Sequence, residues 1–185
     1  YPDDDIGEVT TLIGRNLGVD RLQIVMGGGG DQLIELLTAS LLREGEEIRS
    51  IDPTFDMYRE VAAQRRLRYK AIRLGEGFSL PIDELLRDAE EGSMLVVCNP
   101  NNPTGNSFSK RSLLRLVEEY PGFVLIDEAY VDYGGESLTE NTCNHDNLVV
   151  LRTFSKAYGL AGLRVGYIVS NKRLAEEIGT KHQSP

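Results

Sequence analysis

Two short apolar runs constrain the fold of this chain more than any other feature. Met94–Cys98 and Phe123–Ile126 contain no charged residue and are bounded by turn-forming residues. Apolar runs of this length, without alternation, are typical of strands that are buried on both faces of a sheet. Between them, Leu113, Leu116 and Val117 recur at helical spacing. This alternation of strand and helix predicts an α/β domain with a mostly parallel sheet.

The same alternation extends over the rest of the chain. A first helix is predicted from Ile6 to Leu17, with Gly18 ending it. Thr54 and Ser109 are expected to cap the starts of two later helices. The other expected segments are an apolar approach at 22–26, strands at 47–51, 67–72, 148–151 and 165–169, and helices at 31–44, 82–90 and 172–178. The polar stretch 134–146 is predicted to be a surface loop.

The composition excludes several classes of protein. The chain has 185 residues, and 20 Lys and Arg against 29 Asp and Glu give a net charge of −9. This acidic balance argues against nucleic acid as the main partner, because phosphate backbones require positive surface. No apolar run approaches the ~20 residues of a membrane span, and no signal segment opens the chain. Two cysteines, Cys98 and Cys143, are too few for a disulfide framework, so we expect a reducing cytoplasm.

A glycine-rich segment precedes the helix expected at 31–44. Gly27–Gly30 is followed by Asp31. Glycines let the backbone approach an anion, and a helix N-terminus offers free N–H groups. The segment lacks the lysine of a Walker A loop and the spacing of a dinucleotide fingerprint. Taken alone, it is more simply interpreted as a flexible turn.

Two polar segments follow the apolar runs, where ligands bind in open α/β sheets. Asn99–Gly105 comes after the first run, and such an Asn/Pro/Gly string alone usually forms a tight turn. Asp127, followed by Glu128 and Tyr130, comes after the second run. A carboxylate there can cap the next element or act as a base. No His or Cys lies near enough in sequence to suggest a metal.

A lysine follows another predicted strand. Thr153–Lys156 comes directly after the strand at 148–151, and Arg164 lies eight residues further on. A single lysine is usually a solvated charge, but small and apolar residues follow this one. An amine held away from water is a better nucleophile. We therefore expect Lys156 to lie in a dry pocket.

The ordered set of segments resembles the pyridoxal-phosphate (PLP) enzymes of the fold type I aminotransferase class, and within it the histidinol-phosphate aminotransferases. The likeness covers essentially the whole chain. The matching segments are Tyr1–Asp3, Gly27–Asp31, Asp52–Phe55, Asn101–Gly105, Asp127–Tyr130, Arg152–Lys156 and Gly159–Arg164. The resemblance implies a three-layer α/β/α fold with a mostly parallel sheet. The chain departs from the family pattern in having glycines alone before Asp31 and Gln32 after it.

The resemblance also implies roles for individual residues. Lys156 is expected to form the Schiff base with PLP and to move a proton at the substrate. Asp127 is expected to hold the protonated pyridine nitrogen, which makes the ring an electron sink. Asn102 and Tyr130 would donate to the phenolic oxygen of the ring. Phe55 would stack on its face.

A second group of residues is expected to bind the cofactor phosphate. The cup would comprise Gly30, Asp31, Thr153, Ser155 and Arg164. Tyr1 matches a tyrosine that reaches the cofactor phosphate of the neighbouring subunit, so the resemblance implies a homodimer. It also implies a cis Asn102–Pro103 bond.

The activity implied is amino transfer between an amino acid and a phosphorylated oxo compound, as in histidinol-phosphate:2-oxoglutarate transfer in histidine biosynthesis. Open alternatives are an aromatic or other class I/II aminotransferase, a threonine-phosphate decarboxylase, a non-catalytic PLP-binding regulatory domain and an inactive fragment. Enzymes of this class run roughly twice as long. We therefore expect residues 1–185 to be the PLP-binding large domain, without the N-terminal arm and the C-terminal small domain.

Overall fold

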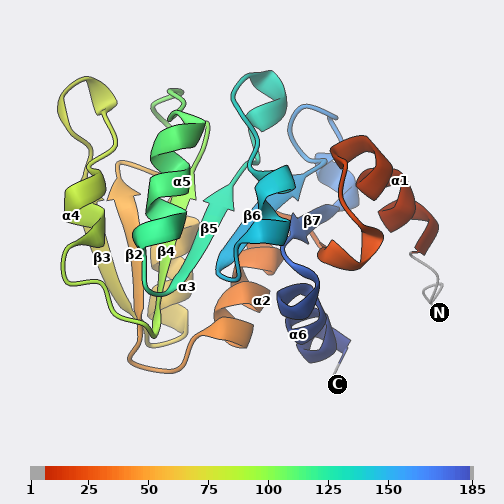
Figure 1. Cartoon of the computed structure of the whole chain (residues 1–185), viewed down its shortest axis with the longest axis horizontal. Coiled ribbons are helices and arrows are strands. Elements are labelled where there is room, and N and C mark those ends of the chain that lie inside the picture. Colours follow the sequence, from red (N-terminus) through yellow and green to blue (C-terminus); the bar gives the residue numbers. More distant parts are fainter. Residues whose placement is uncertain (1–6, 184–185) are drawn as a thin grey trace.

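The computed structural model describes residues 7–183. Its centre is a seven-stranded sheet in the order β1-β7-β6-β5-β4-β2-β3 (Figure 1). The strands are β1 (Ile24–Gly27), β2 (Glu47–Asp52), β3 (Arg68–Arg73), β4 (Ser93–Cys98), β5 (Phe123–Asp127), β6 (Leu148–Thr153) and β7 (Gly166–Val169). The apolar runs of the sequence form the central strands, as predicted.

Strand β7 runs against the other strands of this sheet. It pairs antiparallel with β1 and β6, whereas β3, β2, β4, β5 and β6 pair in parallel. The predicted mostly parallel sheet is confirmed. Every strand except β7 therefore ends at the same edge of the sheet, and the segments that follow these strands gather there (Figure 1).

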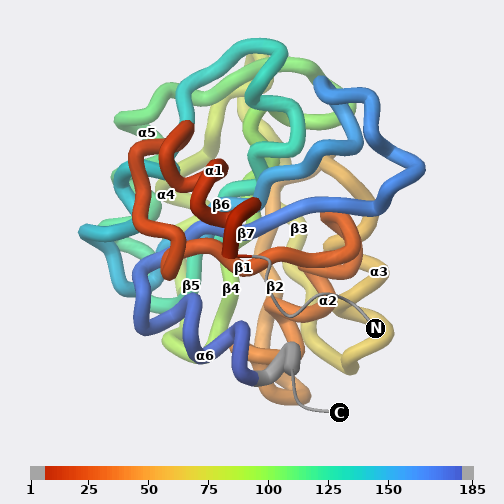
Figure 2. Tube along the Cα trace, turned by 90° about the vertical axis from the view of Figure 1, so that its right-hand side faces the viewer, coloured from red at the N-terminus to blue at the C-terminus, as the bar shows by residue number. Residues whose placement is uncertain are grey.

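Helices cover both faces of the sheet, which confirms the three-layer α/β/α fold. They are α1 (Gly7–Leu17), α2 (Gly30–Leu41), α3 (Met57–Gln64), α4 (Ile82–Leu86), α5 (Lys110–Glu119) and α6 (Lys172–Gln183). Figure 2 shows α2 and α3 on one side of the sheet and α4 and α5 on the other. Helix α6 packs beside α2. Helix α1 lies at the β1–β7 edge.

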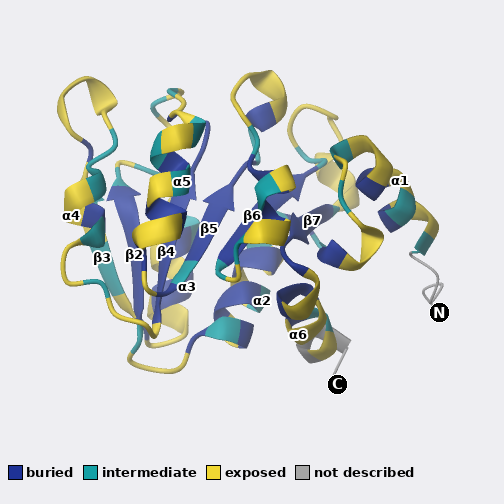
Figure 3. Ribbon diagram, in the orientation of Figure 1, coloured by how far each residue is buried: buried dark blue, intermediate teal, exposed yellow. Residues whose placement is uncertain are grey.

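The apolar side chains form one core on each face. The α2, α3 and α6 face includes Leu33, Leu37 and Tyr58, all fully buried. The α4 and α5 face includes Leu85 and Leu113. The sheet between them is buried along its central strands, and exposed residues lie on the outer sides of the helices (Figure 3). The sheet is thus a rigid support for the segments at its carboxyl edge.

Helix α4 is shorter than the predicted helix at 82–90. It ends at Leu86, and Asp88 adopts a positive φ of 54°. The carbonyls of Leu85, Arg87 and Asp88 accept hydrogen bonds from the buried guanidinium of Arg49. These carbonyls accept hydrogen bonds from a side chain of β2 and not from the N–H groups of a further helical turn. The helix therefore ends here.

The two predicted helix caps have different outcomes. Ser109 precedes α5 and its Oγ accepts a hydrogen bond from the Ser112 N–H, as expected. Thr54 does not cap α3, whose first residue follows Asp56. The Thr54 hydroxyl instead donates to Asn101 Oδ1 at 2.8 Å. That prediction was wrong because the hydroxyl is hydrogen-bonded to the loop after β4 and not to the start of α3.

The stretch 134–146 is not simply a surface loop. It contains a 3-10 helix, Thr139–Asn144. Leu138, Thr139 and Thr142 within it are buried. Among the described residues, no helix combines the length and apolar character that crossing a bilayer would need.

Candidate active site

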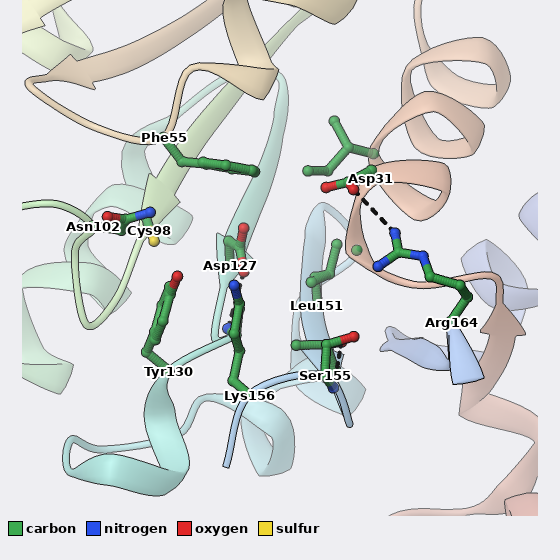
Figure 4. A pocket seen from close by; sticks show the side chains of 14 residues that line it. Asp31, Phe55, Cys98, Asn102, Asp127, Tyr130, Leu151, Ser155, Lys156 and Arg164 are labelled. Carbon is green, nitrogen blue, oxygen red and sulfur yellow. Dashed lines mark hydrogen bonds and ion pairs between the residues drawn. The ribbon is translucent and has the colours of Figure 1, made fainter. Parts of the chain in front are cut away.

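The predicted site residues converge on one pocket at the carboxyl edge of the sheet (Figure 4). Its walls come from the segments that follow β1, β2, β4, β5 and β6 and from the one before β7. The predicted residues that line it are Gly30, Asp31, Phe55, Asn102, Asp127, Tyr130, Thr153, Ser155, Lys156 and Arg164. Tyr1 lies outside the described residues. A pocket built from so many separate segments requires the complete sheet.

A buried carboxylate lines the pocket. Asp127 is the last residue of β5 and is 3% exposed. Its Oδ2 accepts a hydrogen bond from the Tyr58 hydroxyl at 2.7 Å, and its Oδ1 accepts one from the Ala129 N–H at 3.0 Å. Burial raises the pKa of Asp127, and these two donors oppose that effect. The carboxylate is held in one orientation and can receive a cationic N–H from the pocket.

The lysine amine enters the same pocket as the carboxylate. Lys156 follows β6, and its Nζ lies 5.1 Å from the centre of the Tyr130 ring. In Figure 4 the amine points toward Asp127 and Tyr130, with Phe55 on the opposite side. The amine, the carboxylate and two aromatic rings therefore enclose the same space.

The expectation of a dry pocket around Lys156 was wrong for this chain. Lys156 is exposed, as are the residues after it up to Arg164. Within this segment Tyr158 is 57% and Leu163 is 66% exposed. The pocket is open on this side because no described segment covers the stretch between β6 and β7.

The other end of the pocket forms a cationic, glycine-rich cup. Gly29 has a φ of +94° and leads into the N-terminus of α2 at Gly30. A Cβ on Gly29 would lie 3.0 Å from Arg164 Nη2, so glycine allows the guanidinium its close approach. The Arg164 guanidinium also pairs with Asp31 at 3.0 Å. Free N–H groups and a guanidinium suit an anion.

Hydroxyl groups complete this cup. Thr153 Oγ1 accepts a hydrogen bond from the Ser155 N–H at 3.1 Å. Ser155 Oγ is buried and has no hydrogen-bond partner among the described residues. A buried hydroxyl without a partner costs free energy, so this atom is suited to a ligand oxygen.

The departure at Gln32 has a structural role. The Gly28 N–H donates to Gln32 Oε1. This contact ties the glycine-rich turn to the first turn of α2. The side chain thereby supports a loop whose own residues have no side chains to hold it.

Asn102 lines the pocket, and its neighbour Asn101 holds the loop in place. Asn101 is 2% exposed. Its Nδ2 donates to the Pro53 carbonyl at 3.0 Å and to Thr104 Oγ1 at 2.7 Å. The implied cis Asn102–Pro103 bond is present.

Sequence reasoning missed several pocket residues. The pocket is also lined by Ile34, Cys98, Ala129 and Leu151. Tyr58 does not line it, but its hydroxyl donates a hydrogen bond to Asp127. Burial raises the pKa of the Cys98 thiol, so it is a neutral, apolar wall. Cys98 and Leu151 end or nearly end strands, which is a signal that could have identified them. Tyr58 has the helical spacing of a core residue, and no local signal marks it.

A buried ion-pair network lies behind the pocket. Glu128 accepts hydrogen bonds from the Leu138 N–H at 2.6 Å and the Ser137 hydroxyl at 2.7 Å. Arg152 contacts Glu128 at 3.5 Å and pairs with Asp132 at 2.6 Å. Burial raises the pKa of Glu128 to about 7. The network joins β5, β6 and the segment that carries Tyr130.

Comparisons with known proteins agree with this fold. The model of the aminotransferase class I and II family matches residues 3–180, so the chain belongs to that family. Histidinol-phosphate aminotransferase of Clostridium novyi is 36% identical over 180 residues, covering 96% of this chain and 51% of that protein. Histidinol-phosphate aminotransferase 1 of Bacillus thuringiensis is 37% identical over 185 residues, covering 96% and 50%. The chain thus spans about half the length of the curated relatives it matches.

Solved structures show the same fold. Histidinol-phosphate aminotransferase of Clostridium acetobutylicum superposes with a TM-score of 0.88 at 26% identity, covering 100% of this chain and 56% of that one. The enzyme of Sinorhizobium meliloti, solved with pyridoxal-5'-phosphate, also gives 0.88, at 23% identity and covering 98% and 54%. At this identity, the second likeness concerns the fold alone.

Proposed function

We propose that this chain is the PLP-binding large domain of an aminotransferase of the histidinol-phosphate type. The observation that carries the proposal is the pocket itself. An exposed lysine amine, a buried carboxylate and a glycine-rich cationic cup face one another across it. The family membership and the names of the curated relatives support the same class of reaction.

The donors and acceptors of the pocket fit the parts of PLP. The cup around Arg164 would hold the phosphate, where Ser155 Oγ would gain a partner. Asp127 would hold the protonated pyridine nitrogen, and Phe55 would cover the ring. Asn102 and Tyr130, which also line the pocket, would donate to the phenolic oxygen. When bound, PLP supplies an aldehyde that exchanges amines and a ring that withdraws electrons.

The side chains that line the pocket would then have separate roles. Lys156 would attach the cofactor, and its Nζ would take and return the proton at the substrate α-carbon. The Tyr130 ring restrains the amine through the contact at 5.1 Å. Asp127 would keep a proton on the ring nitrogen through a charge-assisted hydrogen bond.

The substrates are proposed from the curated relatives. An amino acid such as glutamate would be the donor, and a phosphorylated oxo compound the acceptor. Because the chain spans about half of these relatives, turnover would require the part of them that this chain does not span. A panel of histidinol phosphate, aromatic amino acids and threonine phosphate would separate the candidates. Release of carbon dioxide from threonine phosphate would contradict the amino-transfer assignment.

A cytoplasmic homodimer is part of the proposal. Tyr158, Leu160 and Leu163 form an exposed apolar strip beside the pocket, which a second subunit would cover. Cys98 and Cys143 are free thiols, in agreement with a reducing compartment.

Covalent trapping tests the cofactor assignment. The chain would be mixed with PLP, reduced with borohydride and mapped by mass spectrometry. We expect an adduct on Lys156, lost in Lys156→Ala and kept in the control Lys70→Ala, whose lysine lies on β3. An adduct on other lysines would contradict the proposal. So would the absence of any adduct in a folded chain, even when the part of the relatives that this chain does not span is added.

A further inference from the structure

We propose that Tyr58 is a positioning residue of this site, whose hydroxyl fixes the orientation in which Asp127 meets the pyridine nitrogen. The inference rests on the PLP-binding function proposed above. It concerns a residue outside the pocket lining, which acts through Asp127 and does not touch the ligand.

The carboxylate of Asp127 is held from two sides. Tyr58 is fully buried, and its hydroxyl donates to Oδ2 at 2.7 Å. The Ala129 N–H donates to Oδ1 at 3.0 Å. Rotation of the carboxylate, which is 3% exposed, would break both hydrogen bonds. Its remaining lone pairs are therefore directed toward the pocket.

Tyr58 also connects the carboxylate to the aromatic cover of the pocket. The rings of Phe55 and Tyr58 meet edge to face, with their centres 5.8 Å apart. An aromatic pair in this geometry is stabilised beyond the contribution of the apolar area that it buries. The short segment from Phe55 to Tyr58 thus carries both an aromatic wall of the pocket and the donor that orients the carboxylate.

A simple core role does not explain the hydroxyl. A phenylalanine would fill the same apolar space between α3 and the sheet without burying an oxygen. Burial and the charge of Asp127 raise the pKa of Tyr58 well above its usual value, so the hydroxyl stays protonated and remains a donor. A donor to a charged acceptor is about twice as strong as one to a neutral acceptor.

The other groups that face Asp127 cannot replace this contact. Asp31 on α2 is a like charge, and Lys156 after β6 is an opposite charge across the pocket. Cys98 on β4 is neutral, and its thiol donates to the Pro100 carbonyl. Among the described side chains, Tyr58 is therefore the hydrogen-bond donor to this carboxylate.

Cofactor binding by Tyr58→Phe tests the proposal. The probes are PLP and a carbocyclic analogue in which C–H replaces the ring nitrogen. We expect roughly tenfold weaker binding of PLP and unchanged binding of the analogue, because hydrogen bonds to charged groups are among the stronger ones. Tyr120→Phe is the matched control, since Tyr120 is also buried and its hydroxyl contacts Ser93 at 2.7 Å on the opposite face of the sheet. Equal loss for both probes, or no loss, would overturn the proposal.

A measurement without cofactor separates this inference from the proposed function. Carbon-13 NMR of labelled aspartate would follow the titration of Asp127 in the chain alone. Its midpoint should move to higher pH in Tyr58→Phe and stay in place in Tyr120→Phe, because only the first variant loses a donor to the carboxylate. An unmoved midpoint would refute the role of Tyr58 even if PLP binds. A moved midpoint with no PLP binding would support Tyr58 and refute the function.

If Tyr58→Phe does not fold, the wild-type chain supplies the answer. A hydroxyl proton in a 2.7 Å hydrogen bond to a carboxylate should give a downfield proton signal with a nuclear Overhauser effect to the Phe55 ring. Asp127→Asn should move that signal upfield. A hydroxyl signal unaffected by Asp127→Asn would show that the two residues are not coupled.

Discussion

At the scale of single residues, Gly29 allows the close approach of Arg164 in the cup. Its φ of +94° is strained for any other residue, and a Cβ would lie 3.0 Å from Arg164 Nη2, which would have to shift. Gly29→Ala should destabilise the chain by roughly 1–3 kcal/mol and should also weaken PLP binding. Urea unfolding and a fluorescence titration with PLP would measure the two effects.

Gly45 provides the matched control at this scale. It has a φ of +87° but nothing within 4 Å of its Cβ position. Gly45→Ala should lower the free energy of unfolding by about as much as Gly29→Ala does. Its affinity for PLP should be unchanged. Equal loss of affinity in both variants would mean that Gly29 acts through stability alone.

At the scale of elements, the buried Glu128, which links β5 to β6, makes the free energy of unfolding depend on pH. Its folded pKa of about 7 lies above the ordinary value of 4.5. The folded state therefore holds this proton more tightly, and the resulting stability is present below pH 4.5 and lost as pH rises through 7. The loss is on the order of 3 kcal/mol.

The variant Glu128→Gln tests this pH dependence. The difference in unfolding free energy between wild type and Glu128→Gln should shrink or reverse between pH 5 and pH 8. Urea titrations at several pH values would give both curves. Parallel curves would show that Glu128 is ionised throughout and that its donors outweigh its burial.

At the scale of the whole molecule, the exposed strip at 158–163 predicts self-association. Leu163→Gln should lower the mass seen in sedimentation velocity. Phe78→Gln should not, although Phe78 is 49% exposed, because it lies in the turn after β3 at the other edge of the sheet. Equal behaviour of the two variants would argue against a subunit contact at this strip.

The sequence predicted the parts of the site that lie at strand ends. Asp127, Thr153 and Lys156 could be identified because apolar runs place the following polar residues at one edge of a parallel sheet. Tyr58 could not, because its partner lies 69 residues away in the chain and its helical spacing resembles ordinary core. The early end of α4 was missed for the same reason, since Arg49 on a distant strand bonds its carbonyls.

The reversed strand β7 has a consequence for how the protein is made. Residues 24–27 pair with residues 166–169, so β1 leaves the ribosome long before its partner β7. Until then β1 is an unpaired edge, and Gly29 has no Arg164 beside it. The cup formed by Gly29 and Arg164 therefore assembles only after the chain has been made as far as β7. A nascent chain that ends before residue 164 would hold the glycine-rich turn without the guanidinium that pairs with Asp31.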